Sequence, residues 1–166
     1  MLEIRPVTIR NWRELSNLKV RDDQSKFVSS NLQSIAEMQF GFDDKPGYGR
    51  WQASSFGIYE GDTPVGFFML GRNPQNPEVQ GYVIRLMVDE KFQGRGYGKF
   101  AMGWILEMFK EDSQVSNLAI SYEPDNEIAR ALYASFGFSE TGEIEDGEVV
   151  AKLNIRMSGT ESKAAQ

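Results

Sequence analysis

The sequence contains neither cysteine nor histidine in its 166 residues. Without Cys, the chain has no disulfide, thiolate nucleophile, iron–sulfur cluster or Cys-type zinc site. Without His, a Ser-His-Asp triad and a histidine general base are also excluded. Any catalysis by this chain therefore has to use Tyr, Asp, Glu, Lys, a backbone group or water, and we expect no metal cofactor.

The sequence also lacks a long apolar run and an excess of positive charge. No segment approaches the roughly 20 apolar residues that span a bilayer, and Glu3 and Arg5 make the first residues resemble a strand rather than a signal peptide. Lys and Arg number 18 against 24 Asp and Glu, a net charge of -6, whereas nucleic-acid binding needs clustered Lys and Arg. We therefore expect a cytoplasmic protein with neither a membrane nor a nucleic acid as partner.

Length and composition predict one globular domain. A chain of this size buries roughly 70% of its unfolded surface, which is enough to fold without disulfides or metals. Hydrophobic residues make up 40% of the sequence, as in other soluble globular proteins. We expect the domain to cover residues 1–157 and a polar C-terminal tail to cover residues 158–166.

Apolar spacing predicts an α/β fold with a mixed sheet, because both hairpins and strand–helix–strand crossovers are expected. The expected strands cover residues 2–7, 51–60, 65–72, 82–88, 118–122, 138–144 and 149–155. The expected helices cover a segment that begins at Asn11 and residues 31–40, 97–110 and 125–135. The predicted order of elements is therefore β-α-α-β-β-β-α-β-α-β-β.

Local patterns in the first third of the chain give more detailed expectations. Asn11 followed by Glu14 predicts a capping box at the start of the first helix. Residues 41–49 are rich in turn formers and are expected to form a loop. Helical spacing over residues 31–40 predicts an apolar face made of Leu32, Ile35, Ala36 and Phe40.

The segment most informative about function joins an expected strand to an expected helix. Gly94, Gly96 and Gly98 follow the strand and lead directly into helix 97–110. Glycines let backbone N–H groups approach an anion, and a helix N-terminus adds about half a positive charge. The pattern predicts a pyrophosphate cradle, with a turn that serves only chain geometry as the alternative. The spacing G-x-G-x-G fits neither the dinucleotide fingerprint nor the P-loop.

Two motifs resemble one family. Gln93-x-x-Gly96-x-Gly98, between a strand and a long helix, resembles the coenzyme A pyrophosphate loop of the GCN5-related N-acetyltransferase (GNAT) superfamily. Downstream, Asn126-x-x-Ala129-x-Ala131-Leu132-Tyr133-x-x-x-Gly137-Phe138 resembles the second acetyl-CoA motif of that superfamily. The resemblance implies the GNAT fold, a single domain whose mixed central sheet is splayed and flanked by helices. It also implies acetyl-CoA as cosubstrate.

The resemblance assigns roles to individual residues. The backbone from Gly94 to Lys99 would bind the pyrophosphate, and the strand edge at residues 86–88 and Asn126 would hold the pantetheine arm. Tyr133 would be the catalytic residue, as proton donor to the departing thiolate. The expected cofactor-binding residues are Leu86, Met87, Val88, Gln93, Gly94, Arg95, Gly96, Tyr97, Gly98, Lys99 and Asn126. Alternatives stay open: Asn126 as a helix N-cap alone, Gln93 as a turn-shaping residue, and Tyr133 as an ordinary half-buried tyrosine.

The implied reaction is direct attack of an amine on acetyl-CoA through a tetrahedral intermediate. Residues 24–34, 85–89 and 146–149 resemble bacterial spermine/spermidine (diamine) acetyltransferases, which implies a polyamine as the small-molecule partner. Ile84 departs from that subgroup, which commonly has an acidic residue there to receive the amine. The residues expected to bind the substrate are Gln24, Phe27, Glu37 and Glu60.

Other functions stay open at this point. The acceptor is alternatively another small amine, an antibiotic or a protein N-terminus. A non-catalytic acyl-CoA-binding sensor with the same fold is the alternative from a different class. Dimerisation is common in the superfamily, and exposed edge strands would allow a homodimer.

Overall fold

One sheet runs through the protein, whose structure is a computed structural model that describes residues 1–157. Its strands lie in the order β1-β3-β4-β5-β6-β8-β7, with β2 paired to β3, and every pair is antiparallel except β5–β6. The strands are β1 (Leu2–Pro6), β2 (Phe42–Asp43), β3 (Arg50–Glu60), β4 (Thr63–Arg72), β5 (Gly81–Val88), β6 (Asn117–Tyr122), β7 (Ser139–Glu145) and β8 (Glu148–Asn154).

Four α-helices and two short 3-10 helices connect these strands. They are α1 (Trp12–Ser16), η1 (Asp22–Phe27), α2 (Asn31–Met38), η2 (Glu90–Phe92), α3 (Tyr97–Glu111) and α4 (Glu127–Ser135). The order of the long elements confirms the predicted fold, with the two-residue strand β2 added inside the expected loop 41–49. The polar tail expected at residues 158–166 lies outside the described residues.

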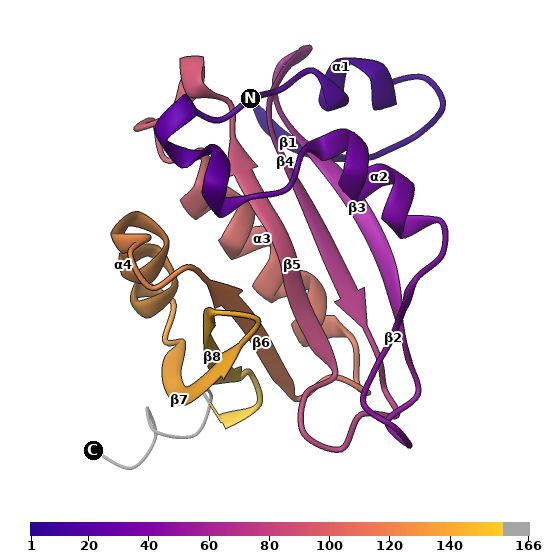
Figure 1. The fold of residues 1–166 in the computed structure, drawn as a ribbon. Helices are drawn as coiled ribbons and strands as arrows, with labels where there is room; N and C mark the ends of the chain where they lie inside the picture. Colours follow the sequence, from indigo (N-terminus) through magenta and orange to yellow (C-terminus); the bar gives the residue numbers. More distant parts are fainter. Residues whose placement is uncertain (158–166) are drawn as a thin grey trace, which may run out of the picture.

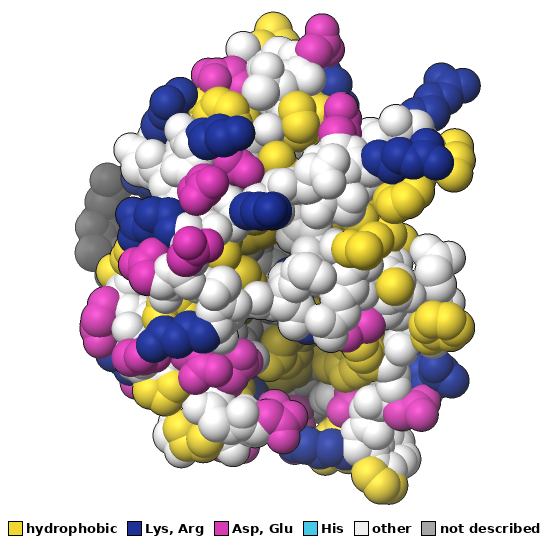
Figure 2. Space-filling view, turned by 45° about the horizontal axis from the view of Figure 1, so that its top comes forward, with side chains coloured by type: hydrophobic (Ala, Val, Ile, Leu, Met, Phe, Trp, Pro, Cys, Tyr) yellow, Lys and Arg dark blue, Asp and Glu magenta, His cyan; other side chains and the backbone are white. Residues whose placement is uncertain are grey.

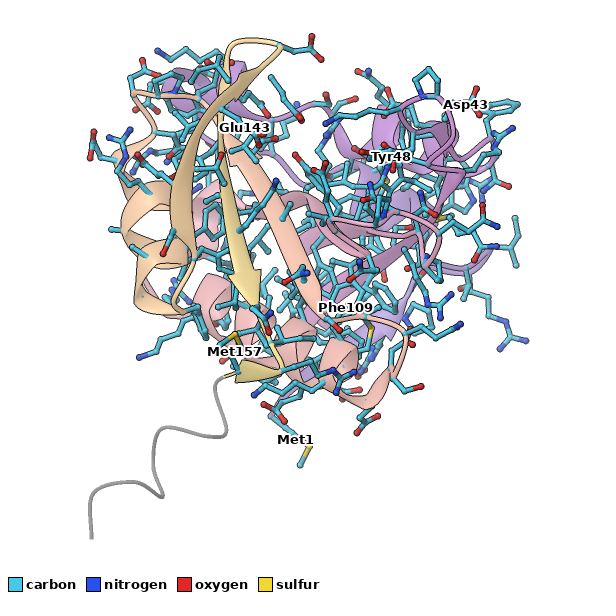
Figure 3. All side chains as sticks on the ribbon, turned by 90° about the horizontal axis from the view of Figure 1, so that it is seen from below. Met1, Asp43, Tyr48, Phe109, Glu143 and Met157 are labelled. Carbon is cyan, nitrogen blue, oxygen red and sulfur yellow. The ribbon has the colours of Figure 1, made fainter. Side chains whose placement is uncertain are left out.

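Different helices cover the two faces of the sheet (Figure 1). Helix α3 packs on one face, where Phe109 points toward the sheet and its ring lies against Gly81 (Figure 3). Helices α1 and α2 cover the other face over a second buried cluster, which includes Leu15, Phe67 and Met87. The core therefore consists of two apolar layers, one on each side of the central strands.

The apolar face expected for helix 31–40 is wrong except at Ile35, which packs against the second cluster. Leu32 and Phe40 are 54% and 78% exposed, whereas Asn31 and Ser34 are buried. Asn31 Nδ2 donates a hydrogen bond to Leu15 O at 2.8 Å, and Ser34 Oγ donates one to Ser30 O at 3.1 Å. The satisfied polar groups of Asn31 and Ser34 therefore face α1 and the sheet. Ile35 and Met38 of α2 pack against the second cluster beside them.

The expected capping box at the first helix is also wrong. The Asn11 side chain accepts a hydrogen bond from the backbone N–H of Thr8 at 2.7 Å and makes none to the first turn of α1. Glu14 accepts from the hydroxyl of Tyr59 at 2.6 Å. The two side chains therefore stabilise the turn before α1 and the contact between α1 and β3, respectively.

Strands β5 and β6 separate halfway along β5. Their parallel pairing covers Gly81–Val83 against Leu118–Ile120 and then stops, although β5 continues to Val88. A bulge in the pairing of β4 with β5 leaves Ile84 without a partner on β4 at the same point. The separation confirms the predicted splay of the central sheet (Figure 1).

Candidate functional site

A cavity of about 590 Å³ opens at the point where β5 and β6 separate. Its walls come from β5, β6, the start of β8, η1, the glycine loop before α3, and α4. Most of the residues predicted to form the site line it: Gln24, Phe27, Leu86, Met87, Val88, Gln93, Gly94, Gly96, Tyr97, Gly98, Asn126 and Tyr133. The structure therefore brings together residues that are more than one hundred positions apart in the sequence.

The glycine loop presents free backbone donors at the N-terminus of α3. Gly94 and Gly96 have φ of +76° and +85°, and an added Cβ at either position would meet no atom within 4 Å. Over residues 1–157, no backbone N–H from Gly94 to Lys99 donates to a protein acceptor. Because these donors point from a helix start, they form a site for an anion.

Gln93 holds the glycine loop against two other elements. Its Nε2 donates to Val88 O at 3.0 Å and to Gln24 Oε1 at 2.8 Å. The side chain thus fixes the turn after β5 and ties it to η1. These contacts favour the turn-shaping role for Gln93 that the sequence left open.

Beyond Val83, one edge of β5 has no neighbouring strand in the described part of the chain. Leu86 and Met87 pair with Phe68 and Phe67 of β4, but β6 no longer lies alongside. The backbone on the open edge borders the cavity instead. An extended ligand can therefore lie along β5 as a further strand would.

Asn126 caps α4 at the other wall of the cavity. Its side-chain oxygen accepts from the backbone N–H of Ala129 at 3.2 Å. The neighbouring Asp125 forms an ion pair with Lys26 of η1 at 2.8 Å, and this contact lowers the pKa of Asp125. The pair links η1 to the loop before α4.

Tyr133 is buried against the cavity from α4. Its ring lies 5.6 Å from that of Tyr122 and 6.2 Å from that of Phe138. Its hydroxyl makes no hydrogen bond to any group in the described part of the chain. Burial raises the pKa of Tyr133 far above its ordinary value, and the neighbouring Tyr122 and Glu148 add to this rise. The phenol therefore keeps its proton at neutral pH.

Four of the predicted residues do not line the cavity. Arg95 lies within the glycine loop and Lys99 follows Gly98, and both are exposed. Glu60 accepts from the hydroxyl of Tyr97 at 2.7 Å, and Glu37 lies 3.6 Å from Arg85 and accepts from Gln33. The two glutamates expected to bind the substrate thus do not line the cavity, although Tyr97 and Arg85, which contact them, do.

Four charged residues that the sequence patterns did not identify line the cavity: Arg21, Lys26, Arg85 and Glu148. Arg85 donates to Ser29 Oγ at 3.2 Å, and its Nε is buried without a hydrogen-bond partner. Glu148 accepts a short hydrogen bond from Ser121 Oγ. Arg85 and Glu148 each lie within a stretch that resembles polyamine acetyltransferases, residues 85–89 and 146–149. This resemblance is the only signal in the sequence that points to either residue.

Two features are absent from residues 1–157. No group of three or more His, Cys, Asp and Glu residues there could hold a metal ion. No helix in the same range is long and apolar enough to cross a membrane.

Known proteins resemble this chain in sequence and in structure. The model of the Acetyltransferase (GNAT) family matches residues 12–138. The spermine/spermidine N(1)-acetyltransferase of Bacillus subtilis is 28% identical over 155 residues, which cover 90% of this chain and 95% of that protein.

Two solved structures share the fold. The spermidine N-acetyltransferase from Vibrio cholerae, in complex with CoA and spermine, has a TM-score of 0.65 at 14% identity, over 91% of this chain and 92% of that chain. The ribosomal-protein-S18-alanine N-acetyltransferase from Escherichia coli has a TM-score of 0.66 at 16% identity, over 97% of this chain and 98% of that chain. At these identities, the likeness concerns the fold alone.

Proposed function

The chain belongs to the acetyltransferase (GNAT) family, and from this premise we propose that it moves the acetyl group of acetyl-CoA to a primary amine of a polyamine. One observation carries the proposal. The free N–H groups of the glycine loop, the open edge of β5 and the buried phenol of Tyr133 all border one cavity.

The cavity fits acetyl-CoA in three places. The N–H groups from Gly94 to Lys99 bind the pyrophosphate, because each is a donor without a partner and the helix dipole favours negative charge there. The open edge of β5 at residues 86–88 pairs with the amides of the pantetheine arm. The Nδ2 of Asn126 is left to donate to that arm, since its side-chain oxygen already caps α4.

Acetyl-CoA supplies an activated carbonyl carbon with a thiolate as leaving group. The amine attacks that carbon directly, which suits a chain without Cys or His. A backbone N–H near Val88 stabilises the negative charge that develops on the oxygen. Tyr133 gives its hydroxyl proton to the departing sulfur as the C–S bond breaks, and solvent then returns a proton to the phenol.

The polyamine part of the proposal rests on relatives and on charge. The Bacillus subtilis spermine/spermidine N(1)-acetyltransferase matches nine-tenths of this chain. The net charge of -6 also favours a cationic acceptor over an anionic one.

Arg85 favours a second candidate function, the acetylation of an amine that also carries a carboxylate. Its guanidinium lines the cavity, and its one ion-pair partner among the described residues, Glu37, lies 3.6 Å away, so a ligand carboxylate could bind there more closely. An acceptor with a carboxylate beside its amine, such as a free amino acid or a peptide, would use that donor. Polyamines have no carboxylate and would leave it unused.

The test measures thiol release from acetyl-CoA with spermine, spermidine, putrescine, an aminoglycoside and lysine supplied separately, and CoA binding by calorimetry. We expect turnover with a polyamine. Turnover with lysine alone would favour the second candidate. If CoA binds but none of these amines is acetylated, the polyamine proposal is contradicted and the sensor alternative gains support.

A further inference from the structure

We infer that Glu148 receives the acceptor amine: its carboxylate binds the cationic nitrogen and accepts the proton that the nitrogen gives up. This inference rests on the proposed acetyl transfer. Ile84 of β5 stands where polyamine acetyltransferases commonly have an acidic residue that receives the amine. Glu148 of β8 would take over this role from a different strand.

The first observation is the composition of the cavity wall. Glu148 is the only Asp or Glu among the described residues that line the cavity. Two of the other acids on nearby elements are already engaged, because Glu37 faces Arg85 and Asp125 pairs with Lys26. A cationic amine that enters the cavity can therefore form an ion pair with one carboxylate of the cavity wall, that of Glu148.

The second observation is that Glu148 has no cation of its own. Within residues 1–157, no Lys or Arg forms an ion pair with it, and its one hydrogen-bond donor is the Ser121 hydroxyl. Glu148 is partly withdrawn from solvent at the start of β8. A half-buried carboxylate without a cation is stabilised when a ligand brings one.

The third observation is the face of the sheet on which Glu148 lies. Ser121 pairs with Val150 across β6 and β8, and side chains alternate along a strand, so Ser121, Val150 and Glu148 share one face. Tyr122 and Val149 point to the opposite face, where Tyr133 packs. The carboxylate and the phenol thus border the same cavity from opposite faces of the sheet, at the point where β5 and β6 separate.

This arrangement divides the proton transfers between two groups. The ammonium R–NH3⁺ gives one proton to the Glu148 carboxylate, and the freed lone pair forms the new C–N bond. The nitrogen gives up a second proton, now acidic, by the same route, and Glu148 passes both to solvent. Tyr133 protonates the sulfur as the C–S bond breaks and regains a proton from solvent. The sum is amide, free thiol and one released proton.

The test compares Glu148→Gln with the wild-type enzyme. The amide keeps the shape of the side chain and the contact with Ser121, so we expect an unchanged melting temperature and unchanged CoA affinity. We expect kcat/KM for spermidine to fall about 100-fold, the size of effect typical of a lost general base, with both a higher KM and a lower kcat. Glu148→Asp should recover part of the loss.

A β-fluorinated diamine separates a role in proton transfer from a merely structural one. Fluorine lowers the pKa of the neighbouring amine, so more of it arrives without the extra proton. The kcat deficit of Glu148→Gln should therefore be smaller with the fluorinated diamine than with the parent diamine. An equal deficit with both would overturn the proton-accepting part of the inference.

Glu145→Gln is the matched control, since Glu145 faces Glu148 in the β7–β8 register but is exposed and does not line the cavity. It should have the same kcat and KM as the wild type.

A Glu148→Gln enzyme with unchanged kinetics would overturn the inference and leave the acetyl transfer intact. If the wild type acetylates no amine, spermidine binding to the CoA complex still decides: weaker binding by Glu148→Gln supports the inference, and equal or absent binding overturns it.

Discussion

Tyr133 differs from four of the other five tyrosines of the chain in the contacts of its hydroxyl. Tyr48, Tyr59, Tyr97 and Tyr122 each donate to a glutamate. Tyr133 has no such acceptor within the described residues, and burial raises its pKa. The phenol therefore holds its proton over the whole neutral range, as any tyrosine does, and a proton donor to a thiolate must be in this state. The hydroxyl of Tyr133 is therefore available to a ligand, while the ring packs in the core.

Removal of this hydroxyl should slow the chemical step alone. Tyr133→Phe keeps the ring packed against Tyr122 and Phe138, so we expect the affinity for acetyl-CoA to be retained. We expect kcat to fall at least about tenfold, or roughly 1.4 kcal/mol of barrier. Single-turnover thiol release together with calorimetric CoA binding measures the two effects separately.

Tyr48→Phe is the control for this experiment. Tyr48 loses a hydroxyl contact to Glu78 at 3.2 Å but lies outside the cavity, so its kcat should match that of wild type. An unchanged kcat for Tyr133→Phe would remove the proton-donor role and return Tyr133 to a packing residue.

At the scale of elements, the start of α3 is the feature on which coenzyme binding depends. The helix begins at Tyr97 after Gly96, whose left-handed conformation lets the loop turn its N–H groups toward the cavity. No protein atom lies near the position of a Cβ there. The space beside the loop is therefore open to a ligand.

Gly96→Asp should abolish this coenzyme site without disturbing the core. The Cβ of the new side chain would meet no atom of the described residues within 4 Å, and the carboxylate would add bulk and a negative charge beside the pyrophosphate position. We expect the CoA dissociation constant to rise at least about 100-fold, or roughly 2.7 kcal/mol, as measured by calorimetry.

Gly47→Asp controls for backbone strain and for charge, because Gly47 has φ of +86° and equally open space in the loop before β3. Both variants should lose a similar amount of stability, and only Gly96→Asp should lose affinity. Normal CoA binding by Gly96→Asp would show that the loop is not the pyrophosphate site.

The elements that could be predicted from the sequence are those whose pattern is local. Strands β3, β4 and β5 and helix α3 follow from runs of apolar residues with one period and from turn residues between them. The face of α2 could not be predicted, since Asn31 and Ser34 are buried by hydrogen bonds that depend on α1 and on the helix itself.

The same distinction applies to the site. The glycine loop, Asn126 and Tyr133 stand in motifs with fixed spacing, so the sequence locates them. Glu148 reaches the cavity only because β8 pairs with β6 beside the separation of β5 and β6. Glu60 and Glu37 have suitable chemistry, but the fold places them against Tyr97 and Arg85. Such assignments depend on contacts between distant segments, which no local pattern encodes.

At the scale of the whole molecule, charge is distributed unevenly between the surface and the cavity. The chain carries a net charge of -6, and acidic and basic side chains are interspersed on the face shown in Figure 2. The cavity wall instead includes three cationic side chains, Arg21, Lys26 and Arg85, against one carboxylate, Glu148. This wall suits an anionic coenzyme, whereas the field of the whole molecule attracts a cation.

Added salt should therefore lower kcat/KM for a polyamine more than kcat/KM for a monoamine. Bound coenzyme adds its own negative charge to the excess on the protein, so the field that draws in a polycation is that of the complex. Between about 0.01 M and about 0.1 M salt, the screening length falls from about 30 Å to about 10 Å, so long-range attraction is lost while contacts within the cavity persist.

We expect kcat/KM for spermine to fall several-fold over this range, with kcat unchanged, and kcat/KM for a monoamine of similar length to fall less. Steady-state rates at saturating acetyl-CoA measure both. Equal salt dependence for the two amines would mean that the surface charge does not steer the acceptor, and that affinity for a polyamine comes from the cavity wall alone.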